Sequence, residues 1–149
     1  MYKTILAPLD GSKRAEAIIP HVEELARRHG AQVVLLRIVE YVSMAETGHT
    51  YLIERALKEF EQRVEAARSY LAIWEAAFRE KGIEIRACVE QGPIVETITS
   101  VAEREGADLI VMTSHGRTGL SHVFYGSVAA GVLHRVARPL LLIRTRGES

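Results

Sequence analysis

The chain has 149 residues, 48% of them hydrophobic, which suits one ordinary globular domain with a full hydrophobic core. Lysine plus arginine and aspartate plus glutamate number 19 each, so the formal net charge is zero. This balance and the low aromatic content, 6%, argue against a surface that binds nucleic acid.

The first two predicted elements are a buried strand and a helix. The run Ile5 to Leu9 is typical of a buried strand, and it ends in the turn Asp10 to Ser12, whose serine is placed to cap the next element. Apolar residues at helical spacing follow from Lys13 to His29 and stop at Gly30, a common C-terminal signal. Because proline removes a hydrogen bond from a helix interior, Pro20 predicts a kink or a split first turn.

The middle of the chain predicts a second strand, a long helix and a third strand. Gln32 to Val39 is a near-continuous apolar run, typical of a strand that is buried on both faces. Tyr51 to Arg79 carries apolar residues at spacings of three and four, which predicts one long helix that ends at Lys81-Gly82. Alternation of apolar and polar residues from Ile83 to Val89 indicates a strand nearer a sheet edge.

Two further strands and two helices are predicted in the C-terminal part. Gly92-Pro93 opens a helix that runs to about Arg104, since proline is well tolerated in a first helical turn. Leu109 to Met112 is a fourth strand, and a glycine-bearing loop follows it. Ser127 to Val136 is helical, and Leu140 to Ile143 is a last apolar strand.

Strands that alternate with helices indicate a parallel sheet with right-handed crossovers. We therefore predict an α/β fold with one Rossmann-like, doubly wound domain over residues 1–149, in which helices cover both faces of a five-stranded parallel sheet. Ligands of such sheets bind at the carboxyl ends of the strands, where the winding reverses direction.

The loop after the fourth strand has the character of an anion site. It runs from a buried strand into a helix N-terminus, where free N–H groups and the helix dipole favour phosphate and glycines let it approach the main chain. Its candidate residues are Thr113, Ser114, His115, Gly116, Gly126 and Ser127. Arg117 adds a cation, which is either a phosphate contact or a solvated side chain. A plain surface turn is the alternative interpretation of the same glycines.

Two other segments end beside this loop in the predicted sheet. Asp10 either accepts hydrogen bonds from a ligand's ribose or adenine region, or caps the turn into the first helix. The main chain of Ile38-Val39 is placed to read the edge of adenine, although core packing explains these side chains equally well.

Signals for catalysis are weak. His115 is the most evident candidate base, but the sequence positions no acid to orient it. The six histidines lack a metal-binding spacing, although magnesium bound through phosphates stays compatible with the sequence. Neither the P-loop pattern nor G-x-G-x-x-G occurs, which argues against a P-loop NTPase and a dinucleotide-binding domain.

Compartment signals are equally few. Cys88 is the single cysteine, which suits a reducing setting, and no apolar run approaches the ~18 residues that a transmembrane helix needs. The charged start of the chain is unlike a signal peptide. We therefore expect a cytoplasmic protein with neither a membrane nor nucleic acid as partner.

Several segments spread along the chain carry a family resemblance. They are Lys3 to Ser12, Gly92-Pro93 with Ile98, Ala107 to Met112, Gly126 to Ala129 and Arg138 to Ile143. On these residues the chain resembles the universal stress proteins from end to end.

In the ATP-binding branch of that family, the loop pattern is G-x-x-G, nine residues, then G-S or G-T, and the loop holds phosphates and ribose. Gly116, Gly126 and Ser127 match this pattern, whereas Thr113 stands in the place of the first glycine. The threonine side chain either crowds the ribose or supplies a hydroxyl.

The resemblance also matches residues outside the loop. Asp10 corresponds to the family's acidic residue after the first strand, and Ile38-Val39 correspond to the segment whose backbone meets adenine. Ser114, His115 and Arg117 are implied to lie close to the nucleotide.

The resemblance implies an ATP-binding regulatory stress-response protein, with Mg²⁺ bound through the phosphates if it is present, and at most slow hydrolysis. It also implies a homodimer joined through the C-terminal edge strand, and protein partners that the sequence does not name. The alternative is a dimeric, stress-related interaction protein of the branch that does not bind nucleotide.

Overall fold

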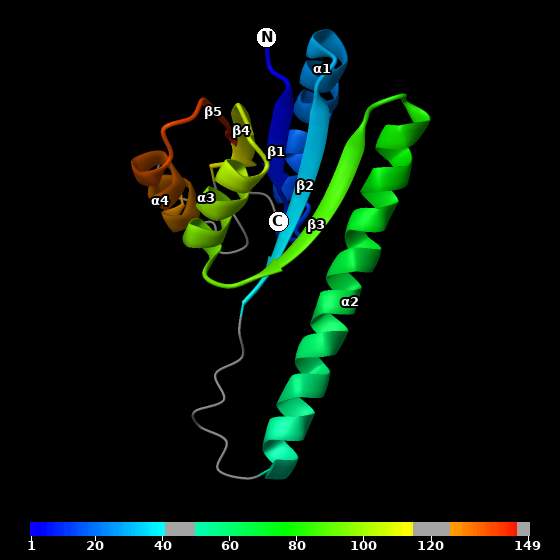
Figure 1. The fold of residues 1–149 in the computed structure, drawn as a ribbon, viewed down its shortest axis with the longest axis vertical. Helices are drawn as coiled ribbons and strands as arrows, with labels where there is room; N and C mark the ends of the chain where they lie inside the picture. The colour runs from blue at the N-terminus through cyan, green and yellow to red at the C-terminus, as the bar shows by residue number, and fades with distance from the viewer. Residues whose placement is uncertain (41–49, 115–125, 146–149) are drawn as a thin grey trace.

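The computed structural model describes residues 1–40, 50–114 and 126–145, which form one parallel sheet with helices on both sides (Figure 1). The order of the strands across the sheet is β3-β2-β1-β4-β5, and every neighbouring pair is parallel. The strands are β1 (Thr4–Pro8), β2 (Gln32–Val39), β3 (Ile85–Gln91), β4 (Leu109–Thr113) and β5 (Leu140–Ile143). The predicted five-stranded α/β architecture is therefore confirmed.

The helices divide between the two faces. They are the short 3₁₀ helix η1 (Ala15–Ile18), α1 (Ile19–His29), α2 (Thr50–Glu80), α3 (Ile94–Arg104) and α4 (Ser127–Arg135). Buried residues of α1 and α2 share one hydrophobic cluster with the sheet, and those of α3 and α4 share another. The sheet is thus doubly wound, as predicted.

Successive residues of the central strands supply these two cores alternately. Ile5 lies in the cluster under α1 and α2, and Leu6 in the cluster under α3 and α4. Val33 and Val34 of β2 divide in the same way, and all four side chains are 0% exposed. This is why these strands appear in the sequence as unbroken apolar runs.

Pro20 splits the first helical segment, one of the two outcomes predicted for it. A 3₁₀ turn precedes α1, and the proline occupies the first turn of α1, where no intrahelical N–H is needed. Gly30 ends α1 in the left-handed conformation, with φ of 63°, and its N–H donates to the carbonyl oxygen of Ala26.

Most predicted boundaries differ from the observed ones by only one or two residues. β3 begins at Ile85 rather than at Ile83, because the N–H of Ile83 donates to Phe78 O at 3.1 Å and closes the end of α2. As predicted from its alternating pattern, β3 lies at an edge of the sheet.

Helix α2 is much longer than the strands beside it. Its 31 residues correspond to about 46 Å of α-helix, whereas the eight residues of β2 span about 26 Å. Figure 1 shows the N-terminal part of α2 extending past the end of the sheet. Among the described residues, no helix combines the length and the apolar character that crossing a bilayer requires.

Candidate functional site

The winding of the sheet reverses between β1 and β4. From β1 the chain passes through α1 to β2 on one side, while β4 lies on the other side and leads through α4 to β5. α1 and α4 lie on opposite faces, so the carboxyl ends of β1 and β4 form the topological switch point. Asp10 follows β1 there, and Ser114 follows β4.

A hydrogen-bonded turn fixes Asp10 at the end of β1. Its Oδ1 accepts the Ser12 N–H at 2.9 Å and the Ser12 hydroxyl at 2.6 Å. The Ser12 Oγ in turn accepts the N–H of Ala15 at 3.1 Å, which is the predicted cap of the helical segment. Asp10 therefore stabilises the turn, the second of its two predicted roles, and a carboxylate retains acceptor sites for further bonds.

The end of β4 is joined to the start of α4. Ser114 is 2% exposed, and its N–H donates to the carbonyl oxygen of Ile143 at 3.0 Å. Its own carbonyl oxygen accepts the N–H of Gly126. Ser127 is the first residue of α4, as predicted, and Gly126 is its N-cap. Both ends of the predicted loop therefore lie together, at the positive end of the α4 dipole.

Three predicted site residues, His115, Gly116 and Arg117, lie outside the described residues.

The predicted adenine-contacting segment ends β2. Ile38 and Val39 are 6% and 2% exposed. The carbonyl oxygen of Ile38 accepts a hydrogen bond from Nη1 of Arg37 at 2.9 Å, and that of Val39 accepts one from the Gly92 N–H at 3.3 Å. Both carbonyls thus have partners within the protein, although a carbonyl oxygen has a second lone pair.

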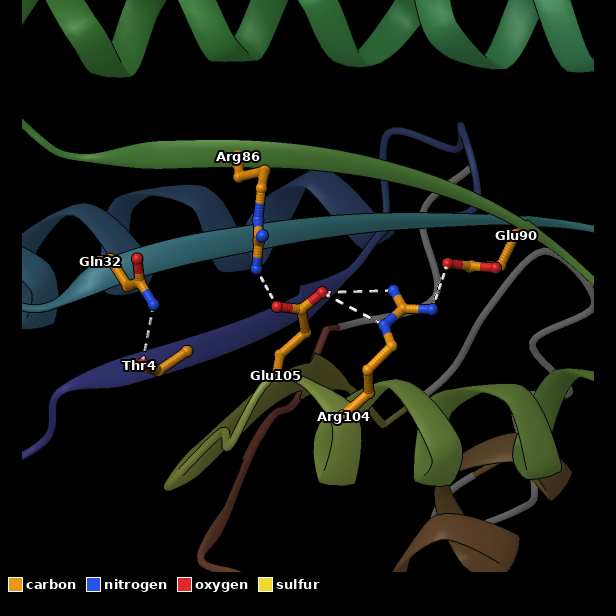
Figure 2. A network of polar contacts seen from close by, with 6 residues as sticks. All are labelled: Thr4, Gln32, Arg86, Glu90, Arg104 and Glu105. Atoms are coloured by element: carbon orange, nitrogen blue, oxygen red, sulfur yellow. Dashed lines mark hydrogen bonds and ion pairs between the residues drawn. The ribbon is translucent and has the colours of Figure 1, made fainter.

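A charged network lies on the α3 side of the edge strand β3 (Figure 2). Its β3 residues lie two positions before and two positions after Cys88, and none of its members belongs to the switch point. Glu105, just after α3, pairs with Arg86 and Arg104, and Arg104 also pairs with Glu90 at 2.7 Å. The hydrogen bond to Glu90 raises the pKa of Arg104. This network attaches the end of α3 to β3.

In the part of the chain that the structure describes, no three histidine, cysteine, aspartate or glutamate side chains group as a metal site.

Residues 1–144 match the sequence model of the universal stress protein family. The chain belongs to this family. Universal stress protein MJ0577 of Methanocaldococcus jannaschii is 27% identical over 159 residues, covering 99% of this chain and 98% of the relative. The solved structure of MJ0577 superposes with a TM-score of 0.86 and 28% identity over 99% of both chains.

Two solved universal stress proteins with nucleotides share the fold. One, in complex with cAMP, has a TM-score of 0.60 and 23% identity over 97% of this chain and 98% of its own. The other, from Archaeoglobus fulgidus in complex with dAMP, has a TM-score of 0.59 and 19% identity over 96% and 98%.

Thr113, which replaces the first glycine of the family's ATP-binding loop pattern, is an ordinary buried strand residue. It is 7% exposed and pairs with Ile143 of β5. Among the described residues no non-glycine has a positive φ, so the Thr113 backbone does not require glycine. Since side chains alternate along a strand, Thr113 lies on the same face as Val111, toward α1 and α2.

Sequence reasoning missed two residues at this end of the sheet. Gly92 was interpreted as a helix start and as part of the family resemblance but not as a site residue, yet its φ of 141° and its bond to Val39 bring the β3–α3 connection to the end of β2. A Cβ at Gly92 would lie 2.9 Å from Oγ1 of Thr97. Arg37 is the one charged residue in the apolar run from Gln32 to Val39, and this exception was the sequence signal that could have indicated it.

Proposed function

We propose that this universal stress protein binds an adenine nucleotide at the carboxyl ends of β1 and β4 and acts in regulation of the stress response. The hydrogen bond between Gly126 and Ser114 carries the proposal, because it brings the N-terminus of α4 to the end of β4. Main-chain N–H groups at a helix N-terminus bind phosphate oxygens, and the helix dipole adds a favourable charge. The cAMP and dAMP complexes of other family members support an adenine nucleotide as the ligand.

Each part of the ligand has a proposed set of contacts. The N–H groups of the first turn of α4, beginning with Ser127, bind phosphate oxygens beside Gly126, together with the loop residues Ser114, His115, Gly116 and Arg117. Asp10 accepts hydrogen bonds from the ribose hydroxyls, beside Thr113. Ile38 and Val39 lie against adenine. ATP is the proposed nucleotide, and Mg²⁺ would bind through its phosphates and water.

We propose regulation rather than catalysis at the switch point. The Asp10 carboxylate is engaged with Ser12, and the sequence positions no acid to orient His115 as a base. We expect the wild-type protein to release phosphate from ATP no faster than a variant that cannot bind nucleotide. A steady-state phosphate-release assay checks this, and turnover well above that variant would indicate an enzyme.

The proposal is tested by calorimetric titration of nucleotide-stripped protein with ATP and magnesium. Saturable heat near one ATP per chain is the expected result. No heat at millimolar ATP, together with no thermal stabilisation, would overturn the proposal. Parallel titrations with AMP and with inorganic phosphate separate recognition of the nucleoside from recognition of the phosphates.

Gly126→Val is expected to weaken ATP binding at least tenfold, or about 1.4 kcal/mol, because a branched side chain blocks approach to the amides. Gly126 has φ of −71° and ψ of 168°, so valine adopts its backbone conformation without strain. Ser127→Ala tests the hydroxyl alone, and Ser100→Ala on the exposed face of α3 is its matched control. Unchanged affinity in Gly126→Val would place the ligand elsewhere.

We also propose a homodimer joined through β5. This strand is at the edge of the sheet, all four of its residues are apolar, and each is half-buried. An apolar strand with an open edge is a template for pairing with another chain.

Thr113 favours a second candidate function, that of a dimeric stress-related interaction protein that binds no nucleotide. A threonine in place of the loop's first glycine adds a side chain where the family's ATP-binding branch has none. The same calorimetric titration distinguishes the two candidates, and a capture experiment for protein partners follows if no heat is seen.

A further inference from the structure

Strands β2 and β3 extend past the end of β1. The last pair between β1 and β2 joins Pro8 to Leu36, whereas β2 and β3 stay paired as far as Val39 and Gln91. On the other side of β1 lies β4. Because neighbouring strands lie about 4.8 Å apart, the end of β2 faces the end of β4 across about 10 Å at the switch point.

The main chain of Ile38 faces this switch point. Carbonyl groups along a strand point alternately to its two neighbouring strands. On the β1 side, the Leu36 oxygen accepts a hydrogen bond from the N–H of Leu9 at 2.8 Å. On the β3 side, the Val39 oxygen accepts one from the N–H of Gly92 at 3.3 Å. The Ile38 carbonyl therefore points to the β1 side, two residues past the last pair with β1.

An arginine side chain reaches this carbonyl where β1 has ended. Nη1 of Arg37 donates to the Ile38 oxygen at 2.9 Å, so the guanidinium lies at the switch point. Arg37 is half-buried, and every other residue from Val33 to Val39 is apolar. A cation at the end of a buried strand costs desolvation free energy, and packing alone does not explain its presence.

A guanidinium in this position distinguishes the edges of purine bases. Its planar fork of N–H donors matches two neighbouring acceptors, and in proteins that bind DNA the commonest specific contact joins arginine to O6 and N7 of guanine. Adenine also presents N7, but it carries an amino group in place of O6. An amino group needs an acceptor, whereas the Ile38 oxygen already accepts a bond from a cation.

We propose that Arg37 determines the base preference of the nucleotide site by donating to the acceptors of the purine edge. The site then accepts 6-oxo purine nucleotides, whose bases are guanine and hypoxanthine, at least as well as ATP. With ATP, Arg37 donates to N7 alone, and with a 6-oxo purine it donates to O6 and N7 together. This inference rests on the proposed function and widens its ligand class from adenine to purine nucleotides.

The experiment compares ATP with ITP, in which an oxygen replaces the amino group of adenine, by calorimetric titration with magnesium. In the wild type we expect ITP to bind as tightly as ATP or more tightly. Arg37→Met replaces the guanidinium by an uncharged side chain. In this variant we expect the affinity for ITP to fall at least tenfold and the affinity for ATP to fall less than about threefold.

Two further variants separate charge, geometry and general effects. Arg37→Lys keeps the charge without the planar fork, so we expect it to bind ATP as the wild type does and ITP more weakly. Arg79→Met is the matched control, because Arg79 also donates to a main-chain oxygen, that of Ile85, but at the amino end of β3. We expect Arg79→Met to change neither affinity, and GTP to follow ITP in every variant.

Wild-type binding of ITP more than about threefold weaker than that of ATP would overturn the inference while leaving the proposed function intact. An equal loss of affinity for ATP and ITP in Arg37→Met would also overturn it, because Arg37 would then only support the end of β2. Absence of saturable heat with every nucleotide would overturn the proposed function and the inference with it.

Discussion

A single carboxylate fixes the amino end of the two central strands. Asp108 precedes β4, and its side chain accepts the N–H groups of Lys3, at 2.9 and 3.1 Å, and of Thr4, at 3.1 Å. Its own N–H donates to the carbonyl oxygen of Thr4 at 3.0 Å. The start of β1 is thus attached to the start of β4, at the opposite end of the sheet from the proposed ligand.

Asp108→Ala is expected to lower the free energy of unfolding by about 2 kcal/mol, because it leaves backbone donors of β1 without their acceptor. Urea denaturation measures the change, and the proposed ATP binding should be retained since the switch point is distant. Glu103→Ala, an exposed carboxylate of α3, is the control. A midpoint for Asp108→Ala equal to that of the control would contradict the role given to this carboxylate.

The sequence predicts side-chain contacts between residues that are close along the chain, but not between distant ones. Ser12 was predicted as a cap because its partner, Ala15, is three residues away. The contact of Asp108 with Lys3 joins residues 105 positions apart, and no local pattern indicates it.

Among the elements, the packing of α3 against α4 depends on a glycine in α4. A Cβ at Gly131 would lie 2.7 Å from Cγ2 of Val95. Valine has one strongly preferred rotamer in a helix, so Val95 cannot easily move away. Gly131 therefore sets how closely α4, whose N-terminus is the proposed phosphate site, approaches α3.

Gly131→Ala sets two effects against each other. Alanine favours a helix over glycine by about 1 kcal/mol, whereas overpacking costs about 1 to 3 kcal/mol. Because the clash at Val95 is with a stiff side chain, we expect net destabilisation of about 1 kcal/mol in urea denaturation. The double variant Gly131→Ala/Val95→Ala removes the clash, and a single variant as stable as wild type would show that the helices separate without cost.

The elements themselves were largely predictable, because period and capping signals are local. Gln32–Val39 and Leu140–Ile143 were predicted with the observed bounds, and Thr50–Glu80 extends one residue beyond the prediction at each end. The order of the strands and the contact between Ser114 and Gly126 arise only from the packing of segments that are separate in the sequence. Positions directly after predicted strands already indicated Asp10 and the loop from Thr113 to Ser127, and the family resemblance matched the same residues.

Over the whole molecule, the two edges of the sheet differ in chemistry. The β3 edge carries the ion pairs of Arg86 and Glu90, whereas β5 is apolar throughout. Charged side chains discourage pairing between edges, so the proposed dimer uses β5. The N–H groups of Ile110 and Ser114 donate to the carbonyl oxygens of Pro139 and Ile143, so alternate residues of β5 face β4.

Leu142→Pro is expected to convert the proposed dimer to a monomer. By this alternation the backbone of Leu142 points to the open edge, so proline removes an outward N–H without removing a bond to β4. Leu141→Pro, which removes an N–H facing β4, is the matched control and should lower the melting temperature instead. Sedimentation measures the oligomeric state of both variants and thermal denaturation measures their melting temperatures. A Leu142→Pro protein that sediments as a dimer would place the interface elsewhere.

The extended part of α2 acts geometrically as a lever. From Thr50 to Tyr70 the helix measures about 30 Å, at about 1.5 Å per residue, and much of that length lies past the sheet. A tilt of about 10° of this segment moves its far end by about 5 Å. A small change of angle where α2 packs on the sheet can in this way change the outline of the molecule over a distance that another protein can detect.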